Sequence, residues 1–165
     1  MRILVLSDTH LPLRSRSLPD RVLSALESSP DLILHAGDLV GVEVIDMLER
    51  YGSVYAVAGN MDPGRMKQQL PRVREIDLGP ITVGMIHGDG LGDSAAQIEA
   101  DLVKRFPEVD VVVFGHIHRP RLNFVDGIWV FNPGSSTDPR GGSPSSFGWI
   151  EVDYNHCRLS IECIG

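Results

Sequence analysis

The sequence has few cysteines, few aromatic residues and no long hydrophobic run. Aromatic residues make up 6% of the chain, and no apolar stretch approaches the roughly 20 residues that a membrane-spanning helix needs. The two cysteines, Cys157 and Cys163, lie in one expected strand roughly 20 Å apart, too far for a disulfide between them. The first residues run directly into Asp8 without the pattern of a signal peptide. These absences predict a cytoplasmic protein with free thiols and no membrane partner.

Two common catalytic motifs are also absent. The chain has neither the glycine-rich phosphate loop of nucleotide hydrolases nor the Gly-x-Ser-x-Gly turn of serine hydrolases. A net charge of -7 argues against nonspecific binding to nucleic acid, which is expected only as a substrate. The 165 residues, of which 42% are hydrophobic, fit one domain over residues 1–165.

Strand and helix patterns alternate in the first third of the chain. Strands are expected at 2–7, 31–35 and 53–58, with helices at 18–28 and 42–51 between them. This alternation favours parallel strands with right-handed crossovers.

Strands dominate the remainder of the chain. One helix is expected at 94–106, with Ser94 as its N-cap. Turns are expected at Gly79-Pro80 and at the hairpin dipeptide Asp126-Gly127. The expected strands are 72–78, 81–86, 111–114, 121–125, 128–131, 147–154 and 158–164.

Polar residues that can bind metals follow five of the apolar runs. Taken singly, each is also explained as a turn former, a cap or a buried histidine. Together they include four of the six histidines, and independent turns give no reason for that gathering. A set of oxygen and nitrogen ligands without thiolates suits divalent transition metals. The residues are Asp8, His10, Asp38, Asn60, His87, His116 and His118.

The spacing of these residues indicates a pair of ions. Alternate side chains of Asp8-Thr9-His10 leave the backbone in the same direction, so both can bind one ion. The pair His116 and His118 has the same spacing and could divide between two ions, while the two oxygens of Asp38 suit a bridge. Two cations roughly 3.5 to 4 Å apart can generate a hydroxide at neutral pH and stabilise its in-line attack on phosphorus.

These motifs resemble those of the calcineurin-like metallophosphoesterases. Their order and the short length of the chain resemble the small prokaryotic phosphodiesterase branch in particular, and the resemblance extends over nearly the whole chain. It includes a late loop, Asn132-Pro133-Gly134-Ser135 with Pro139-Arg140. The motifs themselves are Asp8-Thr9-His10, Gly37-Asp38, Gly59-Asn60, His87-Gly88 and Gly115-His116-Ile117-His118.

The resemblance implies a fold, a cofactor and an activity. The fold is α/β, with two mixed β-sheets sandwiched between helices in four layers, αββα. Asp8, His10 and His118 would hold one metal, Asn60, His87 and His116 the other, and Asp38 would bridge. The metals would be manganese first, or iron, zinc or nickel. The activity would be hydrolysis of a phosphate ester, as a phosphodiesterase, and members of the branch often form homo-oligomers.

The chain departs from the wider family at one catalytic position. Many members place a histidine directly after the asparagine, where it can protonate the leaving oxygen, but here Met61 follows Asn60. Methionine cannot donate that proton. Two hypotheses follow: a preference for esters with good leaving groups, or a substitute acid at Asp62, whose alternative role is a helix N-cap before Pro63.

Other residues near the motifs have candidate supporting roles. His35 could orient a ligand or simply face the core. Arg119 and Arg140 could contact phosphate oxygens or form surface salt bridges, and Arg14 and Arg16 could form a basic rim or remain solvated.

Two alternative functions remain open. The same site could serve a phosphomonoesterase or pyrophosphatase. The chain could also be a non-catalytic scaffold, because a scaffold subunit of eukaryotic membrane-trafficking coats has this fold.

Overall fold

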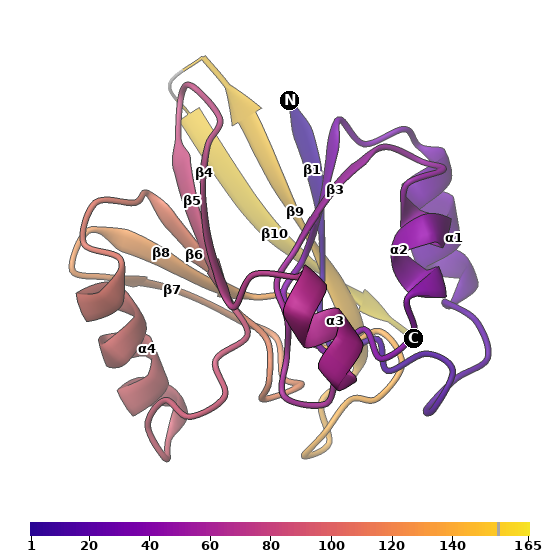
Figure 1. Cartoon of the computed structure of the whole chain (residues 1–165). Coiled ribbons are helices and arrows are strands. Elements are labelled where there is room, and N and C mark those ends of the chain that lie inside the picture. Colours follow the sequence, from indigo (N-terminus) through magenta and orange to yellow (C-terminus); the bar gives the residue numbers. More distant parts are fainter. Residues whose placement is uncertain (155) are drawn as a thin grey trace.

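Two five-stranded sheets form the centre of the molecule. The computed structural model describes residues 1–154 and 156–165. The first sheet has the strand order β10-β9-β1-β2-β3, and the second has the order β4-β5-β6-β8-β7. Helices α1 and α2 cover the outer face of the first sheet, and α4 covers the outer face of the second (Figure 1). This confirms the expected sandwich of two mixed sheets between helices.

The strands of the first sheet are β1 (Arg2–Leu6), β2 (Leu32–His35), β3 (Ser53–Ala56), β9 (Ser145–Asp153) and β10 (His156–Ile164). Those of the second are β4 (Val73–Asp77), β5 (Thr82–Ile86), β6 (Val111–Val113), β7 (Arg121–Val125) and β8 (Ile128–Asn132). The helices are α1 (Asp20–Glu27), α2 (Glu43–Leu48), α3 (Gly64–Gln69) and α4 (Ala95–Arg105).

Alternating side chains explain why the layers form. In β1, Ile3 and Val5 pack in the core between the two sheets, whereas Leu4 and Leu6 pack in the core beneath α1 and α2. A third core lies beneath α4, where Leu102 packs with residues of β6 and β8. Successive side chains of a strand point to opposite faces, so strands covered on both faces must be apolar throughout.

Both sheets contain parallel and antiparallel pairs. Strands β1, β2 and β3 are parallel, as the early alternation predicts, but β9 joins β1 and β10 in antiparallel pairs. In the second sheet, β5, β6 and β8 are parallel, while β4 and β7 are antiparallel edge strands. The predicted turn at Asp126-Gly127 joins β7 to β8, with φ of 49° and 89° at its two residues.

Two helical expectations differ from the structure. The helix expected over 42–51 ends at Leu48, because the chain tightens there and Tyr51 N–H donates to the Leu48 carbonyl at 2.9 Å. The helix implied by an N-cap at Asp62 also differs: α3 begins at Gly64 with Pro63 at its N-cap, and its six residues carry little periodic signal. Within the described part of the chain, no helix is long and apolar enough to cross a membrane.

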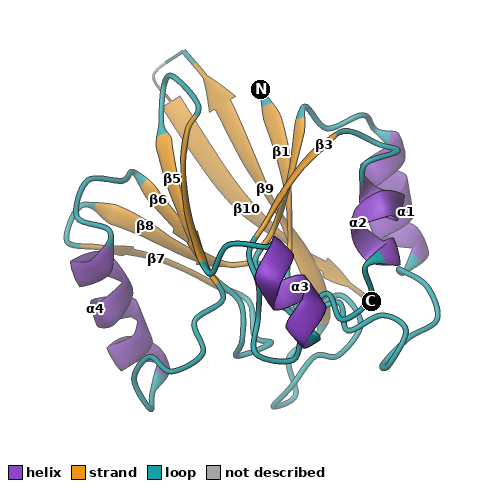
Figure 2. Cartoon of the chain, in the orientation of Figure 1, coloured by secondary structure: helices purple, strands orange, loops and turns teal. Residues whose placement is uncertain are grey.

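The carboxyl ends of the parallel strands meet at one edge of the sandwich. The loops that leave β1, β2, β5 and β6 gather there, next to α3, along the lower side of Figure 2. Open α/β sheets place their sites at this edge.

Candidate metal centre

The seven candidate ligands lie in loops that follow parallel strands of both sheets. Asp8 and His10 follow β1, and Asp38 follows β2. Asn60 lies four residues beyond β3, while His87 directly follows β5. His116 and His118 follow β6, so the two sheets contribute to the same place.

Five of these ligands have backbones in the left-handed region. Residues other than glycine rarely have positive φ, and such strained positions cluster at functional sites. The sharp turns direct consecutive loop side chains toward a common point. The φ values are 52° at Asp8, 45° at His10, 56° at Asp38, 68° at His116 and 55° at His118.

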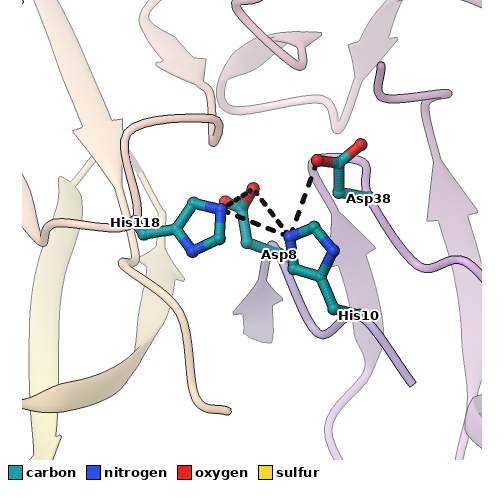
Figure 3. A group of neighbouring side chains, drawn as sticks. All are labelled: Asp8, His10, Asp38 and His118. Atoms are coloured by element: carbon teal, nitrogen blue, oxygen red, sulfur yellow. Dashed lines mark hydrogen bonds and ion pairs between the residues drawn. The ribbon is translucent and has the colours of Figure 1, made fainter. Parts of the chain in front are cut away.

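One group of ligand atoms consists of Asp8, His10, Asp38 and His118, all buried (Figure 3). Their ligand atoms all lie within 4.8 Å of one another. His118 Nε2 is 3.2 Å from Asp8 Oδ1 and 3.2 Å from His10 Nε2. Two imidazole nitrogens and two carboxylates that converge in this way form a donor set suited to a divalent cation.

A second group of candidate ligand atoms, from Asn60, His87 and His116, also adjoins Asp38. Asn60 Oδ1 is 3.1 Å from His87 Nε2 and 3.2 Å from His116 Nδ1. Asp38 Oδ2 is 3.3 Å from His87 Nε2 and 3.6 Å from His10 Nε2. The carboxylate of Asp38 therefore lies between both groups.

Backbone carbonyls fix the orientation of two ligand imidazoles. Nδ1 of His87 donates to the Ala36 carbonyl at 2.7 Å, and Nδ1 of His118 donates to the Asp138 carbonyl at 2.5 Å. In both rings this leaves Nε2 directed at the carboxylates. Such partners hold a metal-binding histidine in the required tautomer.

Asp62 holds together the loops that carry Asp38 and Asn60. Its side chain is buried and accepts hydrogen bonds from the backbone N–H groups of Asp38 at 3.1 Å, Val40 at 2.7 Å and Gly59 at 2.8 Å. It does not cap α3, whose N-cap is Pro63 and has no side-chain cap bond. The neighbouring Met61 donates its backbone N–H to Asp38 Oδ1 at 2.7 Å, while 49% of its surface is exposed.

The late loop supports the first ligand loop through backbone contacts. Ser135 Oγ donates to the Asp8 carbonyl at 2.7 Å, and Thr137 Oγ1 donates to the Thr9 carbonyl at 2.7 Å. Asn132 Nδ2 donates to the Gly115 carbonyl at 2.6 Å. The resemblance pointed to this loop, but the sequence alone gave no signal for these contacts.

Neighbouring charges shift the pKa values of the site. Burial opposes the charged form of His87, but its hydrogen bond with Asp38 and the charges of Asp8 and Asp38 raise its pKa to about 9. Burial also opposes ionisation of Asp38, but the hydrogen bond and charge of His87 outweigh it and lower the pKa of Asp38. The carboxylates of Asp8 and Asp38 are thus ionised at neutral pH while His87 is protonated, so a cation that binds His87 displaces a proton.

His35 lies next to the site. Among the described residues, it has no hydrogen bond to any of the seven candidate ligand side chains. It is fully buried on β2, and its Nε2 lies 3.1 Å from the hydroxyl of Thr9, between two ligands. Burial lowers the pKa of His35 to about 3, so the ring is neutral in the folded protein.

The arginines lie around the site at its surface. Arg14 is 3.5 Å and Arg140 is 3.6 Å from the Asp138 carboxylate, and both are about half exposed. Arg16 lines a separate apolar pocket with Leu11 and Val44. Arg119 and Arg140 line a cavity beside His116.

A buried cluster of carboxylates and imidazoles at the strand ends of an αββα sandwich defines a metal-binding α/β protein. The family model of the calcineurin-like phosphoesterase superfamily domain matches residues 1–155. The chain therefore belongs to this superfamily, whose members bind divalent metals.

Three known proteins illustrate the similarity. A probable metallophosphoesterase of Methanocaldococcus jannaschii is 39% identical over 140 residues, which cover 85% of this chain and 70% of that protein. Vps29 of Entamoeba histolytica, solved with Zn²⁺, is 26% identical with a TM-score of 0.82, over 99% of this chain and 98% of that one. An archaeal phosphodiesterase is 22% identical with a TM-score of 0.74, over 98% of this chain and 100% of that one, which shows the shared fold alone.

Proposed function

We propose that the chain is a phosphodiesterase that uses two divalent cations. The observation that carries this proposal is the position of Asp38, whose Oδ2 lies 3.3 Å from His87 Nε2 and 3.6 Å from His10 Nε2. A carboxylate between two ligand groups suits a bridge between two ions. When bound, such a pair polarises a phosphoryl oxygen, activates water and stabilises an in-line displacement.

The ligand division proposed here has Asp8, His10 and His118 on one side of Asp38. Asn60, His87 and His116 would bind the second cation. Oxygen and imidazole ligands without a thiolate suit manganese, iron, zinc and nickel, and we take manganese first because of the resemblance to the family. The zinc in the Entamoeba Vps29 structure supports the view that this fold accepts a divalent transition metal.

The position after Asn60 carries no side chain that could protonate the leaving group. The Met61 side chain has no proton to donate, and the Asp62 carboxylate accepts hydrogen bonds from three backbone N–H groups. We therefore assign Asp62 a positioning role. Water would then protonate the leaving group, so we expect a preference for esters with good leaving groups. In this proposal Asn60 contributes a ligand oxygen, and Arg140 contacts the phosphate from the rim.

The leading test compares a matched pair of esters. Manganese-loaded protein should hydrolyse bis(p-nitrophenyl) phosphate faster than p-nitrophenyl phosphate, and metal analysis should find two ions per chain. Equal or faster turnover of the monoester would instead favour a phosphomonoesterase, and one ion per chain would contradict the dinuclear proposal.

Replacement of Asp62 by alanine distinguishes its two candidate roles. The variant leaves three backbone N–H groups without their acceptor, and each such loss costs about 1 to 3 kcal/mol when the group is buried. We expect the free energy of unfolding, measured with urea, to fall by at least about 3 kcal/mol. We also expect kcat/KM to fall by a similar factor on aryl methyl phosphates with good and poor leaving groups.

The exposed Asp46 on α2 offers a matched control for this variant. Asp46→Ala should change neither stability nor rates appreciably. A fall in Asp62→Ala that grows steeply as the leaving group becomes poorer would identify Asp62 as the general acid and overturn the positioning role.

The scaffold alternative gains support from the Vps29 fold but not from the ligand positions. All seven positions carry side chains that can bind a metal. If manganese-loaded protein hydrolyses no phosphodiester, and Asp38→Ala preserves binding to a partner protein, the enzyme proposal is wrong.

A further inference from the structure

A polar cavity opens directly beside the second ligand group. Its volume is about 430 Å³, within the range of small-molecule sites, and its wall includes the candidate ligand His116. The other walls come from the N-terminal end of α4, from β7, from the loop after β6 and from the late loop. A molecule held at the metal centre can therefore extend into this cavity.

Three arginine side chains make the cavity cationic. Arg119, Arg121 and Arg140 line it, and Asp93 is the one acidic residue of the lining. Guanidinium groups are well suited to phosphate because their planar fork can donate two parallel hydrogen bonds. The cavity is thus a cationic extension of the site in a chain with a net charge of -7.

The three arginines differ in how far protein carboxylates neutralise them. Arg121 donates to the buried Glu99 at 2.5 Å. Arg140 lies 3.6 Å from the carboxylate of Asp138, which Arg14 and His118 share. Among the described residues, Arg119 has no carboxylate within 4 Å.

Gly141, directly after the late loop, makes room for the guanidinium of Arg119. A Cβ atom at Gly141 would lie 1.9 Å from Arg119 Nη2, and the φ of Gly141 is 61°. A side chain at this position would displace the guanidinium. The N-terminal end of α4 adds a favourable field for an anion, although Ser94 already accepts the N–H of Gln97.

We propose that this arginine cleft binds a second phosphate group of the substrate, next to the phosphodiester at the metal centre. This inference rests on the proposed phosphodiesterase function and specifies its substrate class: phosphodiesters that carry an additional phosphate. Arg119 is the residue that contributes most to the preference, because its charge has no protein partner in the described structure.

Hydrolysis of two matched dinucleotides tests the inference. Diadenylate with a 5′-phosphate (pApA) and diadenylate without it (ApA) share the same internal diester. A charge-assisted hydrogen bond contributes about 1.5 to 3 kcal/mol, so wild-type kcat/KM should be about ten- to a hundredfold higher on pApA. Arg119→Ala should bring this ratio close to unity, and Gly141→Ala should lower it as well.

Arg21→Ala provides the control, because it removes the same charge from an exposed position on α1. This variant should keep the wild-type ratio. A wild-type ratio near unity, or a ratio that Arg119→Ala leaves unchanged, would overturn the inference. Chromatographic separation of AMP from released phosphate shows which bond is cleaved.

Binding measurements separate this inference from the proposed function. If neither dinucleotide is hydrolysed, the phosphodiesterase proposal fails, but calorimetry on manganese-loaded protein still compares the two affinities. At least about tenfold tighter binding of pApA, lost in Arg119→Ala, supports the arginine cleft by itself. Equal affinities contradict it.

Discussion

Asp38→Ala is expected to lower phosphodiester hydrolysis by about a thousandfold or more. The carboxylate contacts a histidine of each ligand group, so its removal should weaken the binding of both proposed cations. Metal ions contribute several kcal/mol of transition-state stabilisation, and about 1.4 kcal/mol corresponds to each factor of ten. Initial rates on bis(p-nitrophenyl) phosphate over a manganese titration give the measurement.

Thermal unfolding provides a second result for the same variant. A ligand at 100 times its Kd stabilises the folded state by about 2.7 kcal/mol, which raises Tm by about 5 to 10 °C in a chain of this size. Manganese should produce this shift in the wild type and in Asp46→Ala, but not in Asp38→Ala. A variant that keeps both the shift and the activity would show that Asp38 is no bridge.

Acid should destabilise the protein through His35. Its pKa is about 3 in the folded protein and 6.5 when unperturbed, so below pH 6.5 the unfolded chain takes up a proton that the folded protein does not. The stabilisation is therefore fully present above pH 6.5 and is lost as the pH falls toward 3. At about 1.4 kcal/mol per pH unit, His35 alone lowers the free energy of unfolding by about 2 to 3 kcal/mol between pH 6.5 and 4.5.

His35→Gln isolates this contribution. Glutamine can keep a hydrogen bond to the Thr9 hydroxyl but does not titrate. Urea unfolding in the presence of a chelator, at several pH values from 4.5 to 7.5, should give a flatter pH profile for the variant. His10 and His116, whose pKa values are also lowered by burial, act in the same direction, so the difference between the two profiles is the quantity to compare. Parallel profiles would show that His35 becomes protonated in the folded protein.

Much of the fold follows from local patterns in the sequence. The alternating strands and helices before Gly59, the Asp126-Gly127 hairpin and the Ser94 cap of α4 all depend on neighbouring residues. The order of strands within two sheets does not, because β9 pairs with β1 across most of the chain. Only the resemblance to a family supplied the division into two sheets.

In the candidate site, too, only the features that depend on neighbouring residues can be predicted from the sequence. The seven candidate ligands can be predicted because each comes after an apolar run, and the structure brings their side chains close together. The residues that hold the ligand loops in place cannot be predicted in this way. Ser135 reaches the Asp8 carbonyl across 127 positions, and Asp62 bonds to N–H groups in two different loops. Hydrogen bonds to backbone atoms leave little trace in the pattern of residue types.

The contribution of both sheets to one site has a mechanical consequence. Asp8 and Asp38 extend from the first sheet, and His87 and His118 extend from the second, so cations held between them would act as cross-links. A link between Asp8 and His118 would close a long loop of the chain. A disulfide that closes a loop of this length destabilises the unfolded state by roughly 5 kcal/mol. Because the candidate site lies at one edge of the sandwich, bound cations would restrain the two sheets at that edge only. Hydrogen exchange in the loops after β1 and β6 should therefore slow when metal is added, and the far edge of the sandwich should respond less.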